Sequence, residues 1–259
     1  MKLGHIEKGI YALRAEHPLV IPQLDPEKYD EHDLQTVLKE LGEIGVSHVA
    51  VGGTIVDAAK MQAVLDIVAK DFGFVTLSYI TNNSLGLLNG IKGKTAVYWM
   101  SVLNAENLYF LRDNLIMNSI AMSKKNFELL PTAYVFDERG SCSSSNWLAR
   151  STPIPRNKAE LSLAIALAAQ YLGMRFYIMA GGSGAPYPPP VEHVKLISKK
   201  TDLFLIPTSG INQVGQAKRL FANGADAIHV GKAIELKNGL KMLRDMVKIS
   251  KKHDGKEFS

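Results

Sequence analysis

Short apolar runs alternate with amphipathic stretches along almost the whole chain. Continuously apolar runs of this length are typical of strands that are buried on both faces of a parallel sheet. We predict strands at Leu19–Leu24, His48–Val51, Phe74–Ile80, Ala96–Leu103, Leu129–Phe136, Phe176–Met179, Leu203–Ile206 and Ile228–Val230. Helical periodicity predicts helices at Glu31–Ile44, Val56–Phe72, Ala105–Met122, Lys158–Leu172, Val191–Lys199, Gln213–Ala222 and Leu240–Lys252. Eight strands in 259 residues predict an α/β protein with one domain, residues 1–259, folded as a (β/α)8 TIM barrel.

Four segments depart from this alternation. We expect residues 1–18 to form a leading helix at or beside the bottom of the barrel, and residues 253–259 to form a polar tail. Residues 81–93 are rich in Gly and Asn, so the third outer helix is expected to be missing or reduced to a turn. The segment Asp137–Asn157 is a long Ser-, Arg- and Pro-rich connection after a strand. Loops at the carboxyl ends of barrel strands surround the active site, so this segment is a candidate binding loop.

The composition narrows the class of protein. Hydrophobic residues make up 46% of the chain and charged residues 21%, which is typical of a globular domain. The one cysteine, Cys142, excludes an internal disulfide framework and a cysteine-based zinc site. No apolar run reaches the roughly 18 residues that cross a bilayer, and no signal-peptide core is seen, so we expect a cytoplasmic protein.

The net charge of +5 does not by itself indicate a nucleic-acid partner. Lysines gather near the C-terminus and around residues 195–200, without the interleaved aromatic residues of a nucleic-acid surface. A solvated helix face is the favoured interpretation, and nucleic-acid binding is not expected. Weak attraction to anionic substrates or to a membrane surface is the alternative.

Three turns of small residues follow the last three predicted strands. They are Ala180-Gly181-Gly182-Ser183-Gly184-Ala185, Thr208-Ser209-Gly210-Ile211 and Gly231-Lys232-Ala233. Small residues let backbone N–H groups approach an anion closely, and the start of a following helix adds a positive dipole end. Because the three turns lie on successive strand ends, they predict one phosphate site built jointly.

The first two strands end in residues that could hold a metal ion. Asp25 follows the first strand and Thr54 the second. A carboxylate and a hydroxyl from neighbouring strand ends can bind Mg²⁺ loosely and leave positions open for substrate phosphate oxygens. The alternative is that Asp25 begins a turn before Pro26 and Thr54 caps the next helix.

The motif order along the chain resembles that of the geranylgeranylglyceryl phosphate synthase family, which includes heptaprenylglyceryl phosphate synthases and the moenomycin-type prenyl-phosphoglycerate synthase. The matching motifs are Leu24-Asp25-Pro26, Val51-Gly52-Gly53-Thr54, Met100-Ser101-Val102-Leu103-Asn104, Pro153-Ile154-Pro155-Arg156-Asn157-Lys158, Tyr177 through Pro186, Ser209-Gly210-Ile211 and Ala225-Asp226-Ala227-Ile228-His229-Val230-Gly231. The match extends from about Leu19 to Glu235, and the combined order is more specific than any single motif.

The resemblance implies a barrel prenyltransferase that forms an ether between an allylic prenyl diphosphate and a phosphorylated three-carbon acceptor such as sn-glycerol 1-phosphate. By position, Asp25 and Thr54 would bind Mg²⁺, and Tyr177 would act at the catalytic centre. The acceptor phosphate would contact Tyr177, Ala180, Gly181, Gly182, Ser183, Gly184, Thr208, Ser209, Gly210, Gly231 and Lys232. The family also implies a homodimer or larger assembly, and the lipid product suggests peripheral membrane contact.

The chain departs from the family pattern at the predicted site. The family has Tyr-Leu-Glu-Ala-Gly-Ser-Gly-Ala after the sixth strand, with a Glu suited to general base work. Here Met179 stands at the Glu position, one Gly is added, and Lys232 replaces a small polar residue. Two interpretations follow: the same chemistry on an altered acceptor such as 3-phosphoglycerate, or a non-catalytic member that binds phosphate or prenyl ligands. Asp137 and Glu138 are acids that could replace the missing base.

The remaining polar and aromatic candidates are less specific signals of a site. Arg156 and Lys158 either clamp diphosphate or are solvated at a helix start. His48 and His229 are expected to be hydrogen-bonded structural residues. The aromatic residues Trp99, Trp147, Tyr79 and Phe136 either line an isoprenoid groove or belong to the core. A barrel isomerase or lyase is the alternative enzyme class, and it would need a paired acid and base that the sequence does not reveal.

Overall fold

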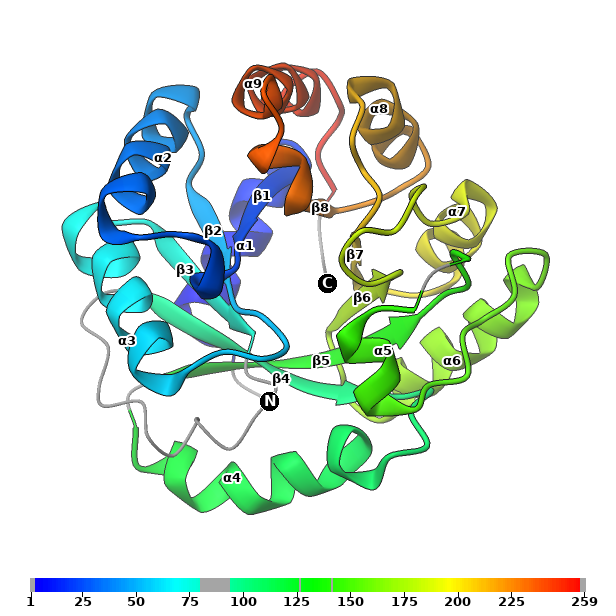
Figure 1. The fold of residues 1–259 in the computed structure, drawn as a ribbon. Coiled ribbons are helices and arrows are strands. Elements are labelled where there is room, and N and C mark those ends of the chain that lie inside the picture. The colour runs from blue at the N-terminus through cyan, green and yellow to red at the C-terminus, as the bar shows by residue number, and fades with distance from the viewer. Residues whose placement is uncertain (1–2, 80–93, 126, 141, 257–259) are drawn as a thin grey trace.

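The protein folds as a closed barrel of eight parallel strands. The computed structural model describes residues 3–79, 94–125, 127–140 and 142–256. The strand order is β7-β6-β5-β4-β3-β2-β1-β8. The sheet closes where the Asp226 N–H donates to the Leu205 carbonyl at 2.9 Å and where Thr208 forms a parallel bridge with His229. The predicted (β/α)8 fold is thereby confirmed (Figure 1).

The observed elements follow the predicted order closely. The strands are β1 (Leu19–Leu24), β2 (His48–Val51), β3 (Val75–Tyr79), β4 (Thr95–Val102), β5 (Glu128–Phe136), β6 (Phe176–Ala180), β7 (Phe204–Pro207) and β8 (Ala227–Val230). The α-helices are α1 (His5–Glu16), α2 (Glu31–Ile44), α3 (Ala58–Asp66), α4 (Asn114–Ser123), α5 (Ser144–Ala149), α6 (Ala159–Tyr171), α7 (Val191–Lys200), α8 (Val214–Ala222) and α9 (Gly239–Ser250). Shorter helical turns are η1 (Pro26–Lys28), η2 (Ile67–Asp71), η4 (Tyr109–Asp113) and η5 (Lys232–Glu235).

The differences from prediction lie in the connections. Helix α5 lies inside the long segment 137–157 that we predicted as a loop, and Ser143 caps it by accepting from the Asn146 N–H at 3.3 Å. The helix predicted over residues 105–122 begins only at Tyr109, as the π-helical turn η4. The predicted loss or reduction of the third outer helix falls on residues 80–93, which lie outside the described residues.

Side chains alternate between two cores because the strand period is two. Ile21, Tyr98, Ile178 and Phe204 belong to the cluster that fills the barrel. Their neighbours in sequence, Val20, Val97, Tyr177 and Leu205, belong to the layer between the sheet and the outer helices. A shift of one residue along a strand therefore decides whether a side chain faces the barrel interior or the outer helices.

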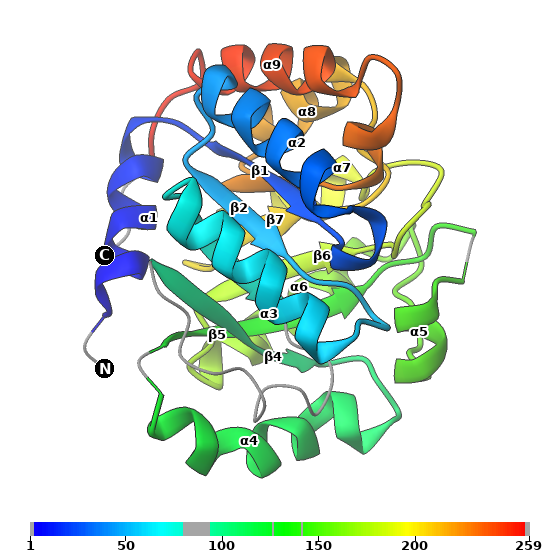
Figure 2. The same ribbon diagram turned by 60° about the vertical axis from the view of Figure 1, so that its left-hand side comes forward.

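Helix α1 closes the amino-terminal end of the barrel, as Figure 2 shows. The Glu128 carboxylate accepts from the Ile6 and Glu7 N–H groups at 2.8 and 2.7 Å, so a strand residue caps the helix. Tyr11 stacks on Phe176 with ring centroids 6.0 Å apart. With this end closed, ligand access is left to the carboxyl ends of the strands.

Part of the predicted polar tail is packed rather than free. The Lys256 N–H donates to the Arg14 carbonyl at 3.1 Å. Buried Asp226 pairs with Arg14 at 3.0 Å and with the Lys256 ammonium at 3.5 Å. The chain end is therefore held against α1 as far as residue 256. Among the described helices, none has the length and apolar character needed to cross a bilayer.

Candidate active site

A cavity of about 370 Å³ opens at the carboxyl ends of the strands. Its polar lining includes residues that follow β1, β2, β6, β7 and β8, and its apolar lining comes mainly from β4, β5 and η4. The predicted site residues around it are Asp25, Thr54, Gly182, Ser183, Gly184, Thr208, Ser209, Gly210, Gly231 and Lys232. The structure thus brings together three small-residue turns that are spread over about 50 positions of the sequence.

The turns after β6 and β7 offer backbone donors on one side of the cavity. Within the described residues, no acceptor is paired with the backbone N–H of Ser183, Gly210 or Ile211. The turn after β7 leads into α8, whose start is fixed by a capping box between Gln213 and Gln216. N–H groups ahead of a helix start attract an anion, so this side of the cavity suits a phosphate group.

The turn after β7 holds an uncommon backbone conformation. Ser209 and Gly210 both have φ of +67°, in the left-handed region. A Cβ on Gly210 would lie 2.2 Å from the Tyr187 carbonyl oxygen, so only glycine fits there. For Ser209 the conformation costs on the order of 1 kcal/mol, and such strain is typical of functional sites.

A fully buried arginine, Arg139, ties this side of the cavity together. Its guanidinium donates to both carboxylate oxygens of Asp137. It also donates to the Thr208 and Ser209 carbonyls at 2.9 and 2.8 Å, and to the Tyr187 carbonyl at 3.3 Å. One side chain therefore links the loops that follow β5, β6 and β7.

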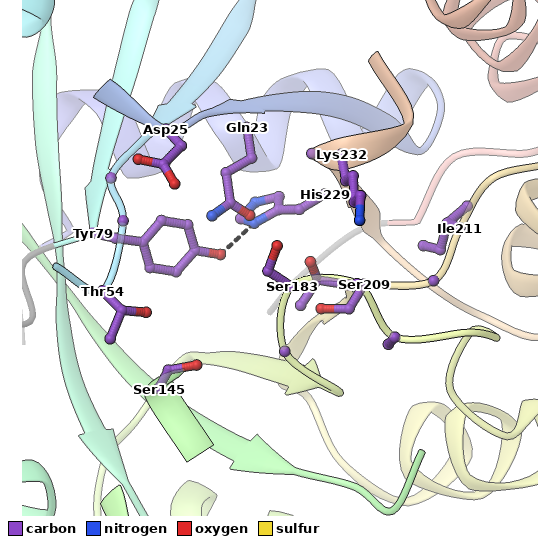
Figure 3. A pocket seen from close by; sticks show the side chains of 18 of the residues that line it. Gln23, Asp25, Thr54, Tyr79, Ser145, Ser183, Ser209, Ile211, His229 and Lys232 are labelled. Carbon is purple, nitrogen blue, oxygen red and sulfur yellow. Dashed lines mark hydrogen bonds between the residues drawn. The ribbon is translucent and has the colours of Figure 1, made fainter. Parts of the chain in front are cut away.

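Asp25 and Thr54 line the opposite side of the cavity (Figure 3). The Gly53 backbone approaches the Asp25 carboxylate so closely that a Cβ there would lie 2.6 Å from Oδ1. Among the described residues, no three His, Cys, Asp or Glu side chains gather to hold a metal on their own. One carboxylate and one hydroxyl beside a phosphate-sized space nevertheless fit Mg²⁺, which is often bound by few protein oxygens together with substrate phosphates.

The apolar side of the cavity is built from β4, β5 and the turn η4. Met100, Val102, Phe110, Tyr134 and Phe136 line it. This side supplies the apolar surface that a hydrocarbon ligand needs.

Two of the four aromatic residues considered for a groove lie at the cavity. Tyr79 and Phe136 line it. Trp99 packs against the outer core instead, and Trp147 on α5 is 71% exposed. A groove role therefore stays a prediction for Tyr79 and Phe136, and the two tryptophans lie outside the cavity lining.

A histidine between two tyrosines lies at the bottom of the cavity. The Tyr79 hydroxyl is hydrogen-bonded to His229 Nδ1, and the Tyr98 hydroxyl lies 3.1 Å from Nε2. Burial lowers the pKa of His229 to about 3 and raises the pKa of Tyr79 well above its ordinary value. His229 is hydrogen-bonded as predicted, and in addition it lines the cavity.

The structure corrects the prediction for Tyr177. This side chain is fully buried in the layer between the sheet and the outer helices, and it does not line the cavity. Among the described residues its hydroxyl has no hydrogen-bond partner. Tyr177 therefore cannot contact a substrate in the cavity, because β6 turns it to the outer face of the barrel.

The neighbouring residues of β6 need the same correction. Met179 also faces the outer layer, so this position does not present its side chain to the cavity. Ala180 and Gly181 are buried outside the cavity lining. Only the later part of this turn, Gly182 to Ala185, reaches the cavity.

Arg156 and Lys158 are not brought to the cavity either. The Arg156 guanidinium lies 4.5 Å above the Tyr187 ring and donates to the Pro188 carbonyl at 3.3 Å. Lys158 is exposed and lies 3.8 Å from Glu160. In this structure Arg156 supports the loop after β6, and neither side chain lines the cavity.

Asp137 and Glu138 do not supply the missing base. Asp137 is 3% exposed and bound to Arg139, and Glu138 lies outside the cavity lining. In the described part of the chain, the lining carboxylates are Asp25 and Glu235, and Glu235 pairs with Lys28 at 2.7 Å. A general base at the centre must therefore be sought among other groups.

Sequence reasoning missed several lining or supporting residues. Gln23, Asn212, Tyr134 and Phe110 line the cavity without lying in any predicted motif, and Ser145 lines it from the segment 137–157 predicted as a candidate binding loop. Arg139 carried one usable signal, namely an arginine three residues after a strand end in a long loop. The sequence around the other residues is that of an ordinary core strand or loop, so it carries no signal of a site.

The fold and the position of the cavity place this protein among the (β/α)8-barrel enzymes. In these enzymes the binding cavity lies at the carboxyl ends of the strands. The family model described as the PcrB family matches residues 12–250. The chain is 33% identical to geranylgeranylglyceryl phosphate synthase of Pyrococcus horikoshii over 251 residues, with 94% of each chain covered. It is 31% identical to the enzyme of the same name from Korarchaeum cryptofilum, with 90% of this chain and 94% of the relative covered. The chain therefore belongs to the PcrB family.

Solved structures agree with this assignment at the level of fold. One of them is the (S)-3-O-geranylgeranylglyceryl phosphate synthase of Thermoplasma acidophilum in complex with sn-glycerol-1-phosphate. It superposes with a TM-score of 0.87 at 24% sequence identity, and the match covers 97% of this chain and all of that chain. The enzyme from Thermoplasma volcanium gives a TM-score of 0.85 at 23% identity, covering 96% and 98%. The predicted resemblance and the predicted enzyme class, a prenyltransferase, are confirmed.

Proposed function

We propose that this protein transfers an allylic prenyl group from its diphosphate to the hydroxyl of a phosphorylated three-carbon acceptor, with sn-glycerol 1-phosphate as the first candidate. One observation carries the proposal: an apolar side and a side rich in backbone donors meet in one cavity. A prenyl chain fits the first and a phosphate fits the second. The names of the relatives and the glycerol phosphate bound to the Thermoplasma acidophilum enzyme support the same reaction.

The protein groups divide the work between the two substrates. Ser183, Gly210 and Ile211 would donate to the acceptor phosphate and thereby hold its hydroxyl near the reacting carbon. Asp25 and Thr54 would hold Mg²⁺, which neutralises negative charge on the leaving diphosphate when bound. Met100, Val102 and Phe136 would exclude water from the allylic centre.

A second acceptor is supported by Lys232. This residue lines the cavity, and its ammonium lies 3.9 Å from where a Cβ on Gly184 would be. A positive charge beside the turns suits an acceptor with a carboxylate besides its phosphate, such as 3-phosphoglycerate. Assembly as a homodimer or larger, contact with a membrane surface and a cytoplasmic location stay predictions.

The test is product analysis with defined substrates. The purified protein is incubated with Mg²⁺, a mixture of farnesyl, geranylgeranyl and longer prenyl diphosphates, and either acceptor, and the products are identified by mass spectrometry. We expect a prenyl ether whose yield falls with Asp25→Asn and is unchanged with Asp245→Asn, a partly exposed aspartate on α9. Intact diphosphates with both acceptors would contradict the proposal.

A further inference from the structure

Among the described residues, no carboxylate at the centre of the cavity is free to take the proton of an acceptor hydroxyl. Of the lining acids, Asp25 belongs to the proposed metal site and Glu235 is paired with Lys28. Ether formation from an alcohol must release one proton. Some group close to the reacting oxygen therefore has to accept it.

Tyr79 and His229 lie between the two polar sides of the cavity. Figure 3 shows the Tyr79 hydroxyl between Asp25 and Thr54 on one side and Ser183 and Ser209 on the other. The metal side would hold the diphosphate and the turn side the acceptor phosphate, so the acceptor hydroxyl must lie between them. Tyr79 and His229 both line the cavity, and their side chains are hydrogen-bonded.

We propose that Tyr79 and His229 form a proton relay that serves as the general base of this enzyme. The inference rests on the proposed transferase function. As the acceptor oxygen bonds to the allylic carbon, the bond from that carbon to the diphosphate oxygen breaks, and its electron pair leaves with the diphosphate. The proton of the acceptor hydroxyl passes to the Tyr79 oxygen while the Tyr79 proton passes to His229 Nδ1.

The hydrogen bonds of the imidazole suit this role. The relay uses the tautomer with its proton on Nε2, where Tyr98 lies 3.1 Å away and can accept it. Nδ1 then accepts from Tyr79 and is the atom that becomes protonated. Tyr98 continues to accept from Nε2–H after the transfer, so the imidazolium keeps a partner inside the barrel.

The buried ring is a weak base, and for this reaction a weak base is sufficient. With the pKa of His229 lowered to about 3 by burial, the imidazole is neutral before the reaction at neutral pH. A protonated ether is a far stronger acid than an imidazolium, so the transfer is downhill. Tyr79 need not ionise, because it gains one proton as it gives up another.

The test compares three variants of the full chain in single-turnover reactions with Mg²⁺, geranylgeranyl diphosphate and glycerol 1-phosphate. Tyr79→Phe removes the hydroxyl and keeps the ring. His229→Gln keeps a donor and an acceptor for the two tyrosines but cannot take a proton. Tyr177→Phe is the matched control, since this buried tyrosine lies outside the cavity and its hydroxyl has no partner among the described residues.

We expect the rate of ether formation to fall about 100-fold in Tyr79→Phe and in His229→Gln, with acceptor affinity unchanged. Tyr177→Phe should react like the parent protein. The parent should also show a curved dependence of rate on the deuterium content of the solvent, because two protons move together, and Tyr79→Phe should lose this curvature. Thermal unfolding of each variant verifies that it is folded.

Each contrary outcome has a distinct meaning. A parent that forms ether, with His229→Gln or Tyr79→Phe at the parent rate, would overturn the relay and leave the proposed function standing. A parent that forms no ether with either acceptor would overturn the proposed function and the relay with it.

Discussion

The two sides of the cavity recognise their ligands with different parts of the chain. The β6–β8 side presents backbone N–H groups on short turns of small residues, and Arg139 ties two of these turns to β5. The β4–β5 side presents side chains, among them Met100, Val102 and Phe110. An anion is bound by fixed dipoles, whereas a hydrocarbon chain needs apolar surface and volume. Substitutions on one side should therefore change the use of one substrate and leave the other unaffected.

The largest effect is expected when Arg139 is replaced. Arg139→Met would leave the Asp137 carboxylate buried without its partner, so the free energy of unfolding should fall by about 3 kcal/mol. Urea unfolding measures this. Arg112→Met, which removes an exposed pair with Asp113, should cost less than about 0.5 kcal/mol.

A double variant tests whether the loss of stability in Arg139→Met comes from the unpaired buried carboxylate. Asp137→Asn added to Arg139→Met removes the unpaired carboxylate and should recover part of the stability. In both variants the KM for the acceptor should rise more than the KM for the prenyl donor, since Arg139 holds the Thr208–Ser209 turn. Equal changes in the two KM values would remove the distinction between the two sides.

Gly210→Ala should lower kcat/KM for the acceptor by about tenfold or more. The new Cβ would meet the Tyr187 carbonyl at 2.2 Å in a backbone conformation that alanine disfavours, so the turn must shift. Gly215→Ala on α8 is the matched control, because a Cβ there meets nothing within 4 Å. Steady-state kinetics with each substrate varied in turn gives the result, and an unchanged acceptor KM would argue against an anion site at this turn.

On the apolar side, Phe110→Ala should raise the KM for the prenyl donor about tenfold, because apolar contact area with the chain is lost. The acceptor KM should not change. Ile120→Ala on α4, where the side chain is 71% exposed, is the control and should affect neither substrate. A larger effect on the acceptor than on the donor would place the prenyl group elsewhere.

The smallest expected effect is at Ser209. Ser209→Gly relieves a left-handed conformation and should raise the free energy of unfolding by about 0.5 kcal/mol, the relief being partly offset by a more flexible unfolded chain. Ser119→Gly in α4 should have the opposite sign, since glycine destabilises a helix interior. Thermal denaturation of the two variants measures both changes in stability. Destabilisation by Ser209→Gly would mean that contacts of the serine side chain stabilise the fold by more than the left-handed backbone conformation destabilises it.

The alternation of apolar runs and amphipathic stretches determined the barrel. Local periodicity decides strand and helix, and eight such strands close with little choice of topology. The small-residue turns were equally visible, because Gly and Ser at strand ends have a local backbone reason to be there. Helix α5 was missed because it begins at a serine cap inside a segment with loop composition.

Only the tertiary structure decided which side chains reach the cavity. Tyr177 and Met179 lie in the right segment but on the outer face of β6, since a strand turns alternate residues away. Tyr79 and His229 are 150 residues apart and meet only because β3 and β8 face each other across the barrel. The local pattern could not reveal their contact, because strand periodicity gives the face of a residue but not its partner across the interior.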